Sequence, residues 1–209
     1  EYDAGWATLV STSAWIESER TLNRDESLFG GFPVPFLFDS KDDSFSQEFR
    51  LVSQSEGPFH YIVGAYYEEY DVETLNSSWG STDEVIVAFG APFGVDSAVL
   101  QQNDFDQFTE QQAVYGELSY SFTEQFELTL GARRFDYDRG THALREGVIA
   151  NLDEGSEFNE TGTSGKVNLS YTPNDDTLVY AQWAEGFRLG APILPIDSDV
   201  CDIAPRDGV

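Results

Sequence analysis

Apolar and polar residues alternate along most of this chain, so every second side chain is apolar. Between 161 and 171 the odd positions end in Val167, Leu169 and Tyr171, whereas the even positions are mostly polar. A period of two predicts β-strands, because successive side chains of a strand point to opposite faces. We expect about seven long strands, at 4–21, 44–54, 59–75, 107–122, 125–140, 159–172 and 176–189.

The connections between these strands alternate between short and long. The segments 55–58, 123–125 and 173–176 are short and rich in the residues that turns select. Three long connections lie near 22–43, 76–106 and 141–158. Strict alternation predicts an all-β fold, an antiparallel up-and-down meander with one plain end and one elaborated end.

The two faces of the predicted strands differ in chemistry. The apolar face predicts contact with lipid and comprises Phe49, Leu51, Tyr61, Val63, Leu118, Tyr120, Leu128, Leu130, Val167, Leu169 and Tyr171. The opposite face predicts contact with a wet or plugged lumen and carries Glu48, Arg50, Glu117, Glu127, Arg133 and Lys166. The expected strands exceed the five or six residues usual in soluble proteins. Aromatic rings gather near the ends of the apolar face, as in the girdles of membrane barrels.

These patterns predict a partial segment of a transmembrane β-barrel. Seven strands are too few for a closed bacterial barrel, and an open sheet in lipid would leave unpaired amides at two edges. We therefore expect the chain to be part of a larger barrel. A soluble secreted β-sandwich that binds carbohydrate, and that buries one face against a second sheet, is the alternative.

Composition narrows the class of protein further. A net charge of −27, from 38 acidic and 11 basic residues, argues against nucleic-acid binding, since phosphates require cations opposite them. No apolar run reaches the roughly 18 residues of a spanning helix, and the first residues do not resemble a signal peptide. The single Cys201 leaves the redox compartment open.

The sequence supports no catalytic, cofactor or metal site. Asp175, in an expected turn, and Glu185, on the strand that follows, are ten residues apart. At about 3.3 Å per residue they lie roughly 30 Å apart, too far for a pair of carboxylates to cooperate. His60 and His142 lack ligands at metal-site spacing. The acidic segment 196–202 offers oxygen ligands for Ca²⁺ but fits no EF-hand, and a solvated loop is the plainer interpretation. We predict that the protein is not an enzyme.

Three stretches carry a resemblance to a known family. They read FSQEFRLVSQSEGPFHYIVGAYYEEY, AVYGELSYSFTEQFELTLGARRFDYD and SGKVNLSYTPNDDTLVYAQWAEGFRLGAP. In order and spacing they resemble the barrel portion of TonB-dependent outer-membrane receptors, over roughly 4–192. The resemblance implies a barrel of about 22 strands around an N-terminal plug, in the outer membrane of a Gram-negative bacterium.

The resemblance also implies a function. Such receptors import siderophores, haem, cobalamin or carbohydrates, powered by the TonB complex. We expect 1–209 to be a fragment of the barrel domain, without the plug domain and the remaining strands. Its expected partners are outer-membrane lipid, a small-molecule ligand, and the plug and TonB complex through parts of the protein outside this sequence. A passive porin-like or adhesin barrel is the alternative.

Aromatic residues in the long connections are candidate ligand contacts. They are Trp79, Phe89 and Phe93 in the second long connection, and Phe29 and Phe36 in the first. One interpretation is packing against neighbouring loops or the plug. The other is contact with ligand in the outer vestibule, because rigid rings are frequent at recognition surfaces. An acidic vestibule would repel the anionic ferric ligands that many such receptors carry.

Overall fold

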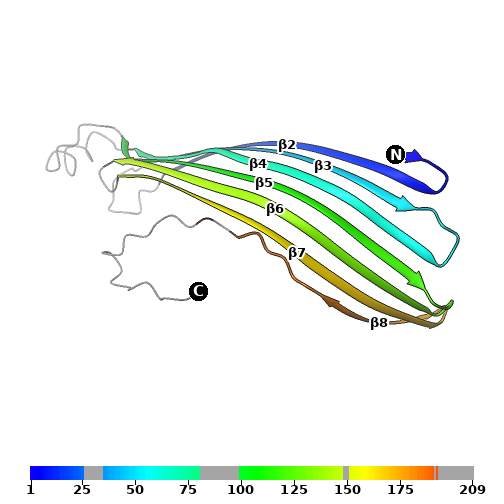
Figure 1. The fold of residues 1–209 in the computed structure, drawn as a ribbon. Coiled ribbons are helices and arrows are strands. Elements are labelled where there is room, and N and C mark those ends of the chain that lie inside the picture. Colours follow the sequence, from blue (N-terminus) through cyan, green and yellow to red (C-terminus); the bar gives the residue numbers. More distant parts are fainter. Residues whose placement is uncertain (26–34, 81–98, 148–150, 191, 193–209) are drawn as a thin grey trace, which may run out of the picture.

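The computed structural model describes residues 1–25, 35–80, 99–147, 151–190 and 192. They form one antiparallel sheet whose strands follow the chain order (Figure 1). The strands are β1 Tyr2–Asp3, β2 Ala7–Asp25, β3 Pro35–Ser53, β4 Phe59–Gly80, β5 Val99–Ser121, β6 Phe126–Gly147, β7 Leu152–Asn174 and β8 Thr177–Ala184. The predicted up-and-down meander is confirmed, with seven strands and the two-residue β1.

Several strands extend further than the alternating pattern indicates. β5 begins at Val99 instead of 107, β6 continues to Gly147, and β7 begins at Leu152. These extensions carry polar residues on both faces, such as Asn103 on one and Asp104 on the other, and therefore lack a regular apolar period. They are held by continuous pairing between strands. In contrast, the strand expected at 176–189 ends at Ala184.

The register places each side chain on one of two faces. Directly opposed residues of an antiparallel ladder point to the same face. One row runs from Tyr61 through Leu118, Leu130 and Val167 to Trp183. Every residue predicted to face lipid lies on the face of this row, and every residue predicted to face the lumen lies on the other.

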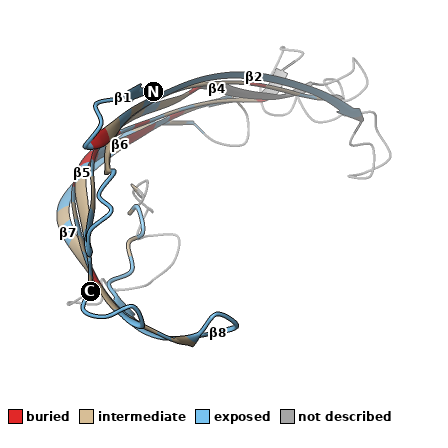
Figure 2. Ribbon diagram, turned by 90° about the vertical axis from the view of Figure 1, so that its right-hand side faces the viewer, coloured by how far each residue is buried: buried red, intermediate tan, exposed pale blue. Residues whose placement is uncertain are grey.

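The sheet is bent into an open arc, and the chain after β8 returns on its inner side (Figure 2). Phe187 of this returning chain packs against Phe135 and Tyr137. The face that carries Phe135 and the residues predicted to face the lumen is therefore the concave one. The face that carries Leu118 and Val167 is convex.

The described residues provide no second layer over the convex face. Val63 is 53% exposed, Leu118 39% and Val167 40%. The main buried cluster, Ala113, Phe135 and Tyr137, lies on the concave side. A soluble sandwich would cover the apolar face with a second sheet, and none is present among these residues.

Aromatic rings delimit an apolar band on the convex face. Phe126 stacks on Tyr171 at the short-turn end, and Phe45 contacts both Trp15 and Tyr67 at the other limit. On β4 the convex apolar residues run from Phe59 to Tyr67, which corresponds to roughly 20 Å across a bilayer at the usual rise and tilt of barrel strands. This is close to the height of the apolar band of an outer-membrane barrel, about 25 Å. The described residues include no helix with the length and hydropathy of a membrane span.

Candidate functional site on the concave wall

Charge is distributed unequally between the two faces of the described strands. On β2 to β7 the concave face carries the cations Arg20, Arg24, Arg50, Arg133, Arg139, Arg145 and Lys166, and the acids Asp42, Glu48, Glu68, Glu117, Glu127, Glu154 and Glu160. The convex face carries Glu17, Glu19, Asp39, Asp43, Glu69, Asp71, Asp104, Asp106, Glu110, Asp136, Asp138, Glu146, Asp153 and Glu157. It offers only the cations Lys41 and Arg134 among the described strand residues. The excess negative charge of the described wall therefore points outward, and the concave wall is balanced.

A hollow of 410 Å³ in the concave face collects most of the residues predicted to face the lumen. Lys166 Nζ lies 2.5 Å from Glu117 Oε2, a contact between β7 and β5 across β6. Arg50 pairs with Glu48 at 3.2 Å, and the Arg133 guanidinium lies over the Tyr66 ring, 5.8 Å from its centroid. The sixth predicted residue, Glu127, lies apart near the short turns, where Ser121 donates a hydrogen bond to it.

A glycine allows one of these contacts to cross a whole strand. Tyr115 on β5 donates a hydrogen bond to Glu48 on β3, and its ring passes over Gly64 on the intervening β4. A Cβ atom at Gly64 would lie 2.4 Å from Tyr115 Cζ. Only glycine leaves room for the ring at this position.

We call the end of the sheet at the long connections its upper end and the end at the short turns its lower end. The chain after β8 is fixed to the upper part of the concave wall. We call residues 185–190 the returning segment. The Phe187 ring lies 4.0 Å from that of Phe135, and Gly190 N donates to the Tyr137 hydroxyl at 2.6 Å. Arg139 donates to Gly190 O at 2.8 Å. Tyr137, which is 1% exposed, donates in turn to Glu160.

The strand expected through 185–189 is therefore wrong for these residues. Glu185 still holds β7, because its carboxylate accepts a hydrogen bond from Gly165 N at 2.7 Å. Asp175 lies in the short connection between β7 and β8, within the turn predicted at 173–176. These two acids belong to different parts of the fold and form no paired site.

Two of the candidate ligand contacts lie on strands and not in loops. Phe36 lies on the concave face of β3, where the Arg24 guanidinium is 5.1 Å from its ring centroid. The backbone of Trp79 pairs with Phe36 from the neighbouring β4. Phe29, Phe89 and Phe93 lie outside the described residues.

The two histidines are separated by the fold. His142 lies on the convex face with its Nε2 atom 2.9 Å from Asp153 Oδ1, whereas His60 lies on the concave face of β4. No group of three or more His, Cys, Asp or Glu side chains in the described ranges has the arrangement of a metal site. The segment 196–202, including Cys201, lies outside those ranges.

Long antiparallel strands, an apolar band between aromatic rings on the convex face and charged groups on the concave face together define a segment of a transmembrane β-barrel. The chain belongs to the TonB dependent receptor-like β-barrel family, whose model matches residues 1–199.

Two solved structures are similar in fold. One is the ferric yersiniabactin uptake receptor FyuA from Yersinia pestis, with a TM-score of 0.69, 16% identity, and coverage of 87% of this chain and 26% of the receptor. The other is the siderophore receptor PiuA from Acinetobacter baumannii, with a TM-score of 0.62, 14% identity, and coverage of 87% and 30%. The chain thus spans about a third or less of the length of these receptors.

Proposed function

We propose that this chain forms part of the wall of an outer-membrane transporter that imports a scarce nutrient, driven by the TonB complex. The observation that carries the proposal is one sheet with an apolar convex band and a balanced, charged concave wall. In this proposal the convex residues face lipid. The concave residues face a lumen that holds the plug domain and admits the ligand. Family membership supports the same assignment.

Among siderophores, haem, cobalamin and carbohydrates, we favour a ferric siderophore as the ligand. Both similar structures are siderophore receptors by description. The concave wall adds a physical argument, because β2 to β7 carry equal numbers of cations and acids on this face. Such a wall does not repel an anionic chelate as the net charge alone suggests. We propose Phe36, Trp79, Phe29, Phe89 and Phe93 as contacts near the outer end.

Uptake in whole cells tests this proposal. Cells without other iron receptors would carry the full-length gene, and uptake of ⁵⁵Fe bound to a panel of siderophores would be measured. We expect uptake of at least one chelate that is lost when TonB is deleted and when an uncoupler removes the proton gradient. Uptake that persists in both conditions would identify a passive pore and overturn the proposal.

A further inference from the structure

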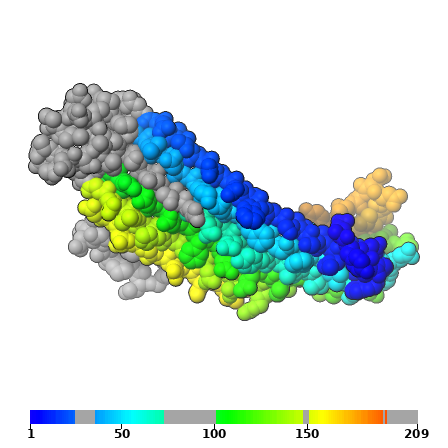
Figure 3. Space-filling view, turned by 90° about the horizontal axis from the view of Figure 1, so that it is seen from above, coloured from blue at the N-terminus to red at the C-terminus, as the bar shows by residue number. Residues whose placement is uncertain are grey.

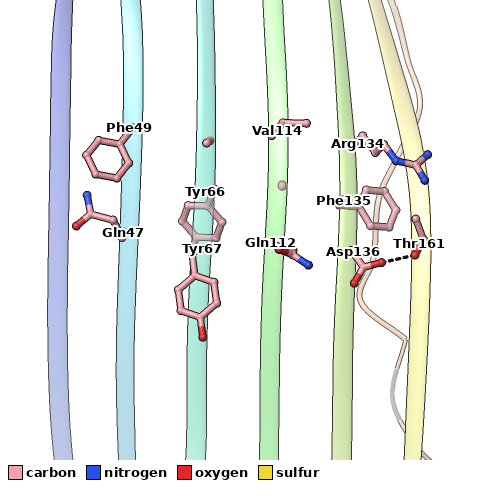
Figure 4. Close-up of a pocket in the computed structure, with 12 residues that line it drawn as sticks. Gln47, Phe49, Tyr66, Tyr67, Gln112, Val114, Arg134, Phe135, Asp136 and Thr161 are labelled. Carbon is pink, nitrogen blue, oxygen red and sulfur yellow. Dashed lines mark hydrogen bonds between the residues drawn. The ribbon is translucent and has the colours of Figure 1, made fainter.

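A second hollow, of 460 Å³, lies on the convex face at the edge of the apolar band that is nearer the long connections. Figure 4 shows the residues that line it. Its apolar part is formed by the small side chains Ala65 and Val114 between the larger Phe49 and Tyr67. Arg134 borders the hollow on β6, and in Figure 4 its guanidinium points toward β7. A groove with an apolar part and one cation is complementary to an amphipathic, anionic ligand.

Arg134 is an unusual residue at this position. The other convex cation, Lys41, lies 2.8 Å from Asp43. The Arg134 guanidinium makes no hydrogen bond or ion pair with the part of the chain that the structure describes. The adjacent Asp136 accepts a hydrogen bond from Thr161 instead. A guanidinium beside hydrocarbon is stabilised by an anion, and its planar fork matches phosphate.

The aromatic belt ends where this hollow begins. On β2 to β4 the upper limit of the apolar band is marked by Trp15, Phe45 and Tyr67. At the level of Tyr67, β5 and β6 carry Gln112 and Asp136 instead of rings. Rings at this depth contact lipid headgroups. Arg134 takes their place along this part of the wall.

We propose that this hollow binds an anionic membrane lipid, with the lipid phosphate on Arg134 and an acyl chain along Val114 and Ala65. The proposal rests on the proposed function in one respect, that the convex face lies in a bilayer. The acidic convex surface above the band favours lipid over a soluble anion. It repels anions that approach from water, whereas a lipid arrives sideways within the membrane.

Native mass spectrometry of the full-length receptor in detergent tests the site, with dioleoyl phosphatidylglycerol as the probe. Arg134→Gln removes the cation, and Arg133→Gln is its matched control, because the neighbouring Arg133 lies on the concave face. Val114→Trp fills the hollow and leaves Arg134 in place. Dioleoylglycerol, which lacks phosphate, and inorganic phosphate complete the comparison.

We expect wild type and Arg133→Gln to bind the probe equally, and Arg134→Gln and Val114→Trp to bind it about tenfold more weakly. Dioleoylglycerol should bind the wild-type receptor no better than it binds the Arg134→Gln variant. Inorganic phosphate should not displace the probe from the wild-type receptor. Equal binding by Arg134→Gln, equal loss in Arg133→Gln, or displacement by phosphate would overturn the proposal. If Arg134→Gln does not fold, Val114→Trp decides alone.

The outcome is separable from that of the uptake assay. A receptor that imports nothing yet binds the probe through Arg134 supports the lipid site and refutes the transport proposal. A receptor that imports iron but whose Arg134→Gln and Val114→Trp variants bind the probe as the wild type does supports the transport proposal and refutes the lipid site.

Discussion

At the scale of single residues, three consecutive positions on β7 separate the two environments of the wall. Val167 and Leu169 lie on the convex face and are 40% and 45% exposed, whereas Asn168 between them lies on the concave face. Leu169 is one step from the ring of Tyr171 at the lower limit of the band. Val167 lies one step further from that limit, nearer the middle of the apolar band.

Arginine at each of these positions therefore has a different cost. Val167→Arg should lower the free energy of unfolding by about 2 to 4 kcal/mol, the value for a cation near the bilayer midplane, and Leu169→Arg by less because the cost falls toward the interface. Asn168→Arg should have little effect. Guanidinium unfolding of the full-length receptor in lipid vesicles measures all three, and equal costs would contradict the assigned faces.

The alternating pattern predicts on which face of the sheet each side chain lies, but it does not predict which side chains interact across strands. Glu117 and Lys166 could be placed on one face from their own strands alone. Their ion pair depends on a register that spans β5 to β7, which is set by pairing between distant segments. The crossing of Tyr115 over Gly64 depends in the same way on the register of three strands.

At the scale of elements, the returning segment depends on an aromatic cluster. Phe135 contacts Phe187, and Phe135 itself lies over Gly162 of β7. A Cβ atom at Gly162 would lie 2.3 Å from Phe135 Cζ. Because Phe135 is only 5% exposed, its ring has little room to move aside.

Gly162→Ala should consequently loosen the returning segment. We expect amide exchange across 186–190 to rise about tenfold, because the displaced Phe135 ring no longer supports Phe187. Gly165→Ala is the control on the same strand, since a Cβ atom there meets its neighbours at 3.6 Å or more. Hydrogen exchange of the full-length receptor measures both. Unchanged protection in Gly162→Ala would show that the cluster does not hold the segment.

The alternating pattern predicts that the strands exist, but it does not predict where they end. The apolar period identifies the strands where one face meets an apolar environment, as at 126–132. Above the band both faces carry polar residues, so no regular apolar period marks 141–147, although β6 continues there. β8 ends earlier than the pattern predicts. The hydrogen bond from Gly190 and the contacts of Phe187 hold the following chain against the concave face, away from the edge of the sheet.

At the scale of the whole molecule, the sequence determines the net charge but does not show on which face of the sheet the charged side chains lie. A net charge of −27 suggests an acidic lumen until the register shows that the acids gather on the convex face above the apolar band. This arrangement leaves the concave wall balanced. The wall then has three surfaces of distinct chemistry, namely an apolar band, an acidic outer surface and a mixed inner surface.

The proposed function requires that the convex band touches hydrocarbon and that the concave face touches water. Nitroxide labels at Leu118→Cys and, as its adjacent concave control, Ser119→Cys test it in the full-length receptor in lipid vesicles, with Cys201→Ser as the background. We predict that the label at 118 collides mainly with oxygen, which concentrates in hydrocarbon, and the label at 119 mainly with a water-soluble nickel chelate. Equal access of the nickel chelate to both labels would contradict the account.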